Sequence, residues 1–192
     1  MTVYAIRTDY YRFQQLDLQL TDLFPFVPED IDFDDVVQFS QRNASLKSWW
    51  QAPDTRFIPI EDKPEGEIPD LSLWLYATLV LSPKAHRLLG ELLQPHGEFL
   101  PVTVAGETFH IFNCLTFGEE DSEACQHERI DDVELGLNEL VFRDSAEQLV
   151  IFKSRLQNAA SLFCTERLKQ VVESCELSGV VFDTNLIEVF SE

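Results

Sequence analysis

The chain has 192 residues, of which 34 are acidic and 14 are basic, so its formal net charge is −20. Apolar residues make up 45% of the chain, and its 15 Phe and 3 Trp argue against a disordered tail and for a packed core. A surface this acidic repels phosphate, which disfavours direct binding to nucleic acid or to an anionic membrane. A basic protein or a cation is the favoured kind of partner, unless the charge serves solubility alone.

The compartment is expected to be the cytoplasm. No run of 18 uncharged apolar residues occurs, so a membrane span is not predicted. Residues 1–13 lack the basic segment and apolar run of a secretory signal. The four cysteines form no CxxC pair, which predicts reduced and mostly buried thiols.

In the first third of the chain, residues 2–7 (TVYAIR) are predicted to form a strand. Residues 25–35 (PFVPEDIDFDD) are predicted to form an irregular acidic loop, and the many Pro and Gly in 49–70 predict an extended segment. Trp49 and Trp50 are expected to pin that segment to the core, although a binding role for the pair stays open.

The middle of the chain has stronger local signals. The apolar run 73–81 predicts a buried strand, with or without a short helix before it, and Ser82-Pro83 predicts a capped helix that extends to about residue 94. Strands are predicted at 98–104 and 107–117, joined by a tight turn at Ala105-Gly106.

The last third repeats this order of elements. Residues 160–164 predict a strand, Thr165 could cap a helix over about 166–176, and a further strand follows Gly179 at 180–182. We therefore predict a single α+β domain over residues 1–192, with a mixed or largely antiparallel sheet flanked by a few helices. Its two strand–capped helix–strand units could reflect a duplication or independent recurrence.

Residues 118–139 hold nine acids against one base, which predicts either a solvated loop or a surface that faces a partner. A second acidic cluster follows Pro28. The candidate partner-binding residues are Glu119, Glu120, Asp121, Glu123, Asp131, Asp132 and Glu134, and then Asp30, Asp32 and Asp34.

Enzyme motifs are mostly absent, and no cofactor is expected. There is no glycine-rich phosphate loop, GxSxG or HExxH. The DxDxD run at Asp30 has Asp35 where a calcium loop needs Gly, and Gln41 where it needs Glu. Cys125, His127 and Asp131 could ligate a metal or form the centre of a small hydrolase, but the negative surroundings disfavour a thiolate.

An ordered set of short motifs resembles the bacterial "immunity protein 11" family of polymorphic toxin systems. The resemblance spans about residues 49–183, although Phe117-Gly118-Glu119-Glu120 stands where the family tends to have Leu-Asp. The residues that carry it are Pro69, Asp70, Ser82, Gly97, Glu98, Leu100, Pro101, Phe112, Asn113, Thr165, Leu177, Gly179 and Phe182.

The resemblance implies a small α+β protein that binds and blocks a cognate toxin and is not itself catalytic. On charge grounds the toxin is expected to be basic, and the acidic residues named above are expected to occlude its active site. The alternatives are an acidic adaptor or chaperone for a secreted effector, and the hydrolase that would use Cys125 and His127.

Overall fold

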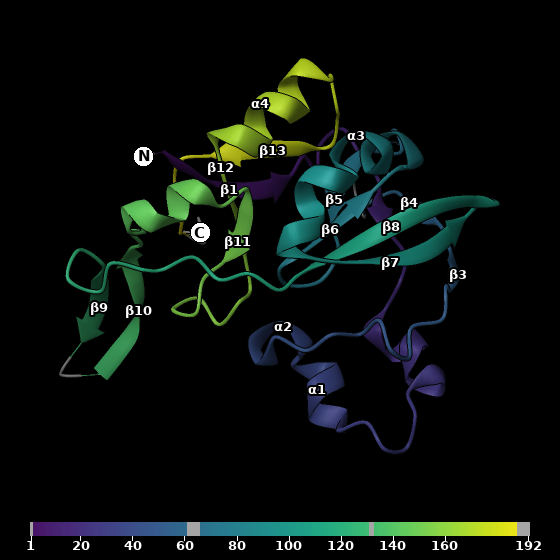
Figure 1. Cartoon of the computed structure of the whole chain (residues 1–192), viewed down its shortest axis with the longest axis horizontal. Helices are drawn as coiled ribbons and strands as arrows, with labels where there is room; N and C mark the ends of the chain where they lie inside the picture. Colours follow the sequence, from purple (N-terminus) through teal and green to yellow (C-terminus); the bar gives the residue numbers. More distant parts are fainter. Residues whose placement is uncertain (1, 61–65, 131–132, 188–192) are drawn as a thin grey trace.

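The computed structural model describes residues 2–60, 66–130 and 133–187. Its largest sheet has the strand order β3 (Asp54–Thr55), β7 (Gly97–Val104), β8 (Glu107–Cys114), β6 (Thr78–Leu81) and β5 (Leu71–Leu73). All neighbours in it are antiparallel except β3 and β7. The predicted α+β class is confirmed (Figure 1).

A second, fully antiparallel sheet lies beside the first. Its order is β11 (Ile151–Lys153), β12 (Leu162–Thr165), β1 (Val3–Thr8) and β13 (Val180–Asp183). Two short ribbons complete the described strands: β2 (Gln15–Leu16) with β4 (Phe57–Ile58), and β9 (Gln126–Ile130) with β10 (Val133–Glu139).

The two strand–helix–strand units have the same topology. Helix α3 (Pro83–Leu93) connects β6 to β7, and helix α4 (Glu166–Ser174) connects β12 to β13. In each unit the two connected strands are parallel to each other and flank one antiparallel strand, β8 in the first and β1 in the second. Strand β1, at the start of the chain, therefore lies between the two strands of the second unit, near the end of the chain.

Both units share one apolar core, which both helices cover. Leu81, Leu89 and Phe112 from the first unit pack in the same buried cluster as Cys164 and Leu168 from the second. The opposite face of the larger sheet is covered by the N-terminal segment in a second buried cluster, which includes Phe39, Trp49 and Leu100. This segment contains α1 (Phe33–Val37), α2 (Phe39–Arg42) and the 3-10 helix Leu20–Phe26 (Figure 1).

Several local predictions are confirmed. The Ser82 hydroxyl accepts a hydrogen bond from the Ala85 N–H and caps α3. Ala105 and Gly106 both have positive φ, of 50° and 85°, as a two-residue hairpin turn requires. Trp49 is 7% exposed and belongs to the second core cluster, in agreement with its predicted core role.

Three expectations are wrong in detail. The run 73–81 contains the predicted buried strand only at 78–81 (β6); before it the chain turns back from β5, because Thr78 Oγ1 bonds to the Leu75 N–H and C=O. Residues 25–35 are not wholly irregular, because the Asp32 carboxylate accepts from the Asp34 N–H and starts α1. Thr165 occupies the cap position of α4, but its hydroxyl donates to the Leu149 C=O instead of capping.

Two further 3-10 helices, Gln94–His96 and Asp144–Gln148, connect the elements. None of the helices in the described part of the chain has the length and apolarity that crossing a membrane requires.

Candidate functional site

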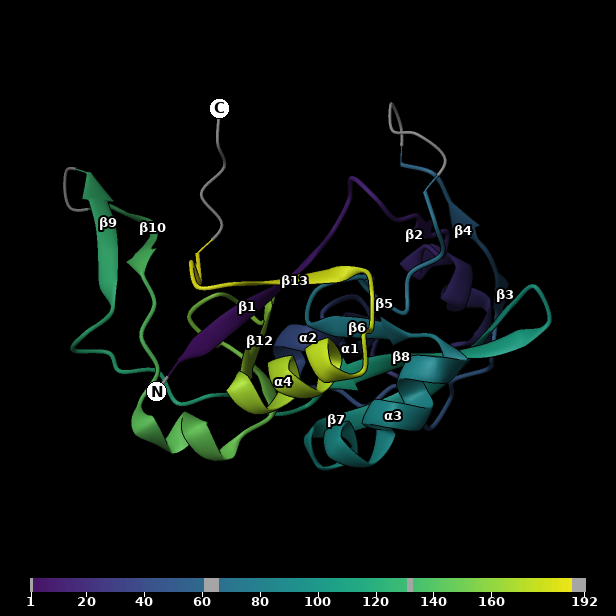
Figure 2. The same ribbon diagram turned by 90° about the horizontal axis from the view of Figure 1, so that it is seen from above.

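The acidic segment 118–139 ends in a hairpin that stands at one end of the molecule. Strands β9 and β10 pair only with each other among the described strands, and both views show them projecting away from the sheets (Figures 1 and 2). Leu140 and Cys125 anchor the base of the hairpin in a third apolar cluster with Phe152 and Phe163. Of the two alternatives for this segment, a solvated loop therefore does not describe it throughout, since it forms an arm (residues 118–139) on a packed base.

Two of the predicted acids hold the base of this arm together. The Glu120 carboxylate accepts hydrogen bonds from Ser154 Oγ at 2.8 Å and from the N–H groups of Arg155 and Leu156 at 2.6 and 3.3 Å. Asp121 accepts from the Glu123 and Ala124 N–H groups, which closes a turn. Both carboxylates thus have internal structural roles.

Glu119 and Glu123 are more accessible to a partner. Glu119 is exposed, accepts a hydrogen bond from Ser145 Oγ and forms an ion pair with Arg143 at 3.4 Å. The Glu123 side chain is exposed, and within the described residues its carboxylate makes no hydrogen bond or ion pair. Glu134 lies in β10 opposite Arg129 in the strand register, whereas Asp131 and Asp132 lie outside the described residues.

The second acidic cluster is partly neutralised from within, by one Arg. The Arg42 guanidinium contacts the carboxylates of Asp32, Asp34 and Asp35 at 3.3, 3.0 and 3.0 Å. The hydrogen bond to Asp35 and the other nearby carboxylates raise the pKa of Arg42. Asp30 is exposed beside this cluster. Helix α1 and the hairpin of β9 and β10 lie apart in both views, so the structure does not bring Asp30, Asp32 and Asp34 together with the arm residues as one continuous site (Figures 1 and 2).

Cys125 has the surroundings of a structural thiol. Its side chain is 8% exposed and packs in the third apolar cluster. Its Sγ lies 3.5 Å from the Val141 C=O and 3.3 Å from the Val141 N. His127 lies two residues further on in β9, opposite Leu137. Among the described residues, no three His, Cys, Asp or Glu side chains are placed to hold a metal ion.

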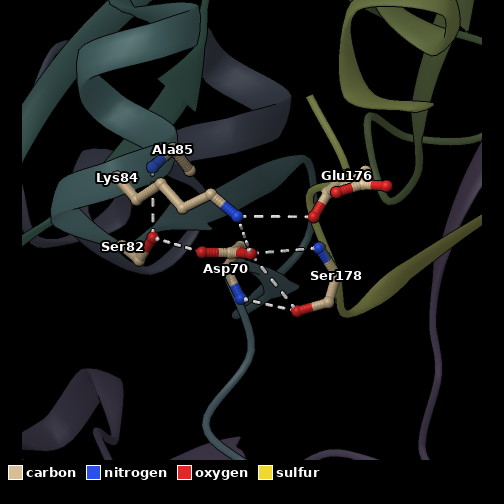
Figure 3. A network of polar contacts seen from close by, with 6 residues as sticks. All are labelled: Asp70, Ser82, Lys84, Ala85, Glu176 and Ser178. Carbon is tan, nitrogen blue, oxygen red and sulfur yellow. Dashed lines mark hydrogen bonds and ion pairs between the residues drawn. The ribbon is translucent and has the colours of Figure 1, made fainter. Parts of the chain in front are cut away.

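The polar residues of the resemblance motifs form two internal networks. In the first, Asp70 joins the start of α3 to the segment before β13 (Figure 3). Its carboxylate accepts from Ser82 Oγ at 3.1 Å and from the Ser178 N–H at 3.2 Å, and it forms an ion pair with Lys84 at 3.2 Å. Partial burial raises the pKa of Asp70, but the Ser178, Lys84 and Ser82 contacts outweigh it and hold the pKa below its usual value.

The second network surrounds Glu98, which is 8% exposed. One carboxylate oxygen accepts from the Leu46 N–H and from Asn113 Nδ2 at 2.8 and 2.9 Å, and the other accepts from Ser45 Oγ at 2.6 Å. Asn113 Nδ2 also donates to the Ala44 C=O. Glu98 therefore fastens the N-terminal segment to the larger sheet, a structural role.

Sequence reasoning missed a buried cation near the base of the arm. Lys153 is fully buried, its Nζ donates to the Ser40 C=O at 2.6 Å, and it lies 4.8 Å from the Phe117 ring centroid. Burial lowers the pKa of Lys153 to about 8. The signal in the sequence was a lone Lys at the end of the apolar run 149–153.

Comparison with models of known protein families found no match, and no curated protein matched the chain either.

Proposed function

We propose that this protein is an immunity protein that binds a cognate toxin stoichiometrically and occludes its active site with the acidic arm. The observation that carries the proposal is the arm itself: segment 118–139, whose sequence holds nine acids and one base, ends in a hairpin that projects from the body (Figure 2). A basic toxin would be steered onto this surface by long-range electrostatics.

The construction of the arm supports this role. The bonds made by Glu120 and Asp121, together with the apolar cluster under Cys125 and Leu140, fix the base of the arm before any partner binds. A surface that is ordered in advance loses less conformational entropy on binding. Glu119 and Glu123 remain on the outside, where they can reach a basic partner.

The motif resemblance supports the same role. Its polar residues, Asp70, Ser82, Glu98 and Asn113, hold the fold together, as expected where specificity lies in the variable surface. We further propose that the protein acts in the cytoplasm. All four cysteines are free thiols, which suits a reducing compartment.

The test is a rescue assay with the product of the neighbouring reading frame. That frame is expressed in a susceptible host alone, with this protein, and with a Glu119→Lys/Glu123→Lys variant. We expect the neighbour to kill, the wild type to restore growth, and the variant to rescue poorly. Glu91→Lys/Glu107→Lys is the control, since both residues are exposed, lie outside the arm and are not among the candidate partner-binding residues. A toxic neighbour that the wild type does not relieve would contradict the proposal and favour an adaptor.

A further inference from the structure

Part of strand β1 has an edge without a strand partner. Strand β1 pairs with β12 over Val3–Ala5 and with β13 over Ala5–Thr8. Along Ile6–Thr8 the edge that faces β12 therefore has no strand pairing in the described part of the chain. The cause lies in the segment before β12, where Asn158 and Ala159 have positive φ of 51° and 52° and turn the chain aside.

A groove of about 460 Å³ lies at this edge. We call it the Tyr10–Tyr11 groove. The residues that line it include Ile6 to Tyr11 at the end of β1, Leu73 of β5, Ser161 before β12 and Val181 of β13. It is thus formed where the two sheets meet, by segments far apart in the sequence. The turn after β1 stands out from the body in Figure 2.

The groove has exposed aromatic and aliphatic side chains on its wall. Tyr10 is 51% exposed, Tyr11 is 77% exposed and Val181 is 47% exposed. Tyrosine is enriched among the residues that dominate binding energy at protein interfaces, because it offers a large, rigid contact area. The groove is therefore suited to an apolar side chain of a partner.

One carboxylate gives the groove a charge preference. Arg7, in the groove wall, forms an ion pair with Asp183, so these two charges offset each other. Asp9 Oδ1 accepts from the Tyr11 N–H, and Oδ2 lies 3.9 Å from the exposed Arg12 guanidinium, a distance at the limit of an ion pair. Asp9 therefore favours a basic group, in line with the net charge of −20.

We propose that the Tyr10–Tyr11 groove binds an extended segment of the toxin that carries an apolar side chain next to a Lys or Arg. The segment adds as a strand to the open edge at Ile6–Thr8, its apolar side chain lies against Tyr10 and Tyr11, and its basic group reaches Asp9. The inference rests on the proposed function and adds a second contact surface to the acidic arm.

The first experiment needs no toxin. A phage-displayed library of random linear 12-residue peptides is selected on the full-length protein, and enriched peptides are synthesised and titrated. We expect peptides that pair apolar with basic residues, at least about tenfold weaker binding to Tyr10→Ala/Tyr11→Ala, and unchanged binding to Leu88→Ala. Leu88 is 45% exposed on α3 and serves as the matched apolar control.

Two further measurements complete the peptide experiment. Strand addition predicts slower amide hydrogen exchange at Thr8 in the peptide complex, because the Thr8 amide faces the open edge whereas the Arg7 amide faces β13. Thermal melting of the double variant should match that of the wild type, since both tyrosines are exposed. The proposal is overturned if no peptide is enriched on the wild type, if enriched peptides bind the double variant equally well, or if exchange at the Thr8 amide is unchanged.

The second experiment repeats the rescue assay with the same variants. Rescue by wild type and Leu88→Ala but not by Tyr10→Ala/Tyr11→Ala supports the groove as a toxin contact. Full rescue by the double variant refutes the groove and leaves the proposed function intact. Peptide binding at the groove without rescue by the wild type refutes the proposed function, and with it the toxin as the occupant.

Discussion

Replacing Asp70 by Ala should destabilise the protein substantially, because Asp70 connects the two strand–helix–strand units. The substitution leaves the Ser178 N–H and the Lys84 ammonium without their carboxylate, and it removes the contact with the Ser82 hydroxyl (Figure 3). Hydrogen bonds to a charged group each contribute about 1.5–3 kcal/mol. Because the Asp70 side chain is still 18% exposed, we expect a total loss of about 2–4 kcal/mol.

For a chain of this length, that loss corresponds to a decrease in Tm of roughly 4–16 °C. Asp70→Asn should cost less, about 1–2 kcal/mol, because the amide keeps one oxygen that can accept from the Ser178 N–H. The pKa of Asp70 is lowered in the folded state, so its contribution is present above about pH 4, the usual pKa of Asp. It is lost as the pH falls through the lowered value, and the variants should then approach the wild type.

The assay is urea denaturation at pH 7 and at pH 3, monitored by tryptophan fluorescence, with Asp30→Ala as the control because Asp30 is exposed. Equal midpoints for Asp70→Ala and Asp30→Ala at pH 7 would refute the structural role of the Asp70 network. A double-mutant cycle with Lys84→Ala, which removes the ion pair to Asp70, should give a coupling energy above about 0.5 kcal/mol.

Three other variants test the remaining structural arguments. Glu98→Gln should lower the free energy of unfolding in urea by about 2–3 kcal/mol, because both oxygens accept hydrogen bonds and the new amide NH₂ must face a donor. Glu107→Gln, on the exposed part of β8, is the control, and a loss smaller than that of the control would contradict this prediction. Gly179→Ala should lower the free energy of unfolding by several kcal/mol more than Gly106→Ala. Both glycines have positive φ, but only at Gly179 would a Cβ lie 2.1 Å from the Leu71 backbone oxygen. Equal melting temperatures of the two variants would contradict this packing. Burial, together with the stacked His86 ring, lowers the pKa of His110 to about 4. As the pH drops, the unfolded chain therefore binds a proton at this residue at a higher pH than the folded chain does, and the free energy of unfolding falls between about pH 6.5 and 4. We expect that loss to be about 1–2 kcal/mol after solvent screening and to shrink in His110→Phe, whereas an unchanged pH profile in the variant would show that other groups cause it.

The parts of the fold that could be predicted from the sequence are those set by local chemistry. Ser82-Pro83 starts α3 and Ala105-Gly106 turns β7 into β8, and both signals act within a few residues. The placement of β1 between β12 and β13 could not be predicted, because its partners lie about 160 to 180 residues further along the chain. The hairpin β5–β6 was missed for a different reason: its turn is local, but it depends on one threonine side chain inside an apolar run.

The candidate site was predicted as a region of charge, and the roles of its members were not. Glu120 and the Asp32–Asp35 group looked like surface acids, but their partners are Ser154 and Arg42, which no local pattern connects to them. Glu119 and Glu123 are exposed in the structure, as a partner surface requires. Their binding role stays a prediction.

The most direct test of the central claim is a titration of toxin activity. The purified product of the neighbouring reading frame is held at a fixed concentration well above the dissociation constant, and this protein is added in increasing molar ratio. The account predicts a linear loss of activity that ends at one equivalent, with weaker inhibition by Glu119→Lys/Glu123→Lys. Complete inactivation at a small fraction of an equivalent, increasing with time, would contradict stoichiometric binding and indicate that the chain acts catalytically.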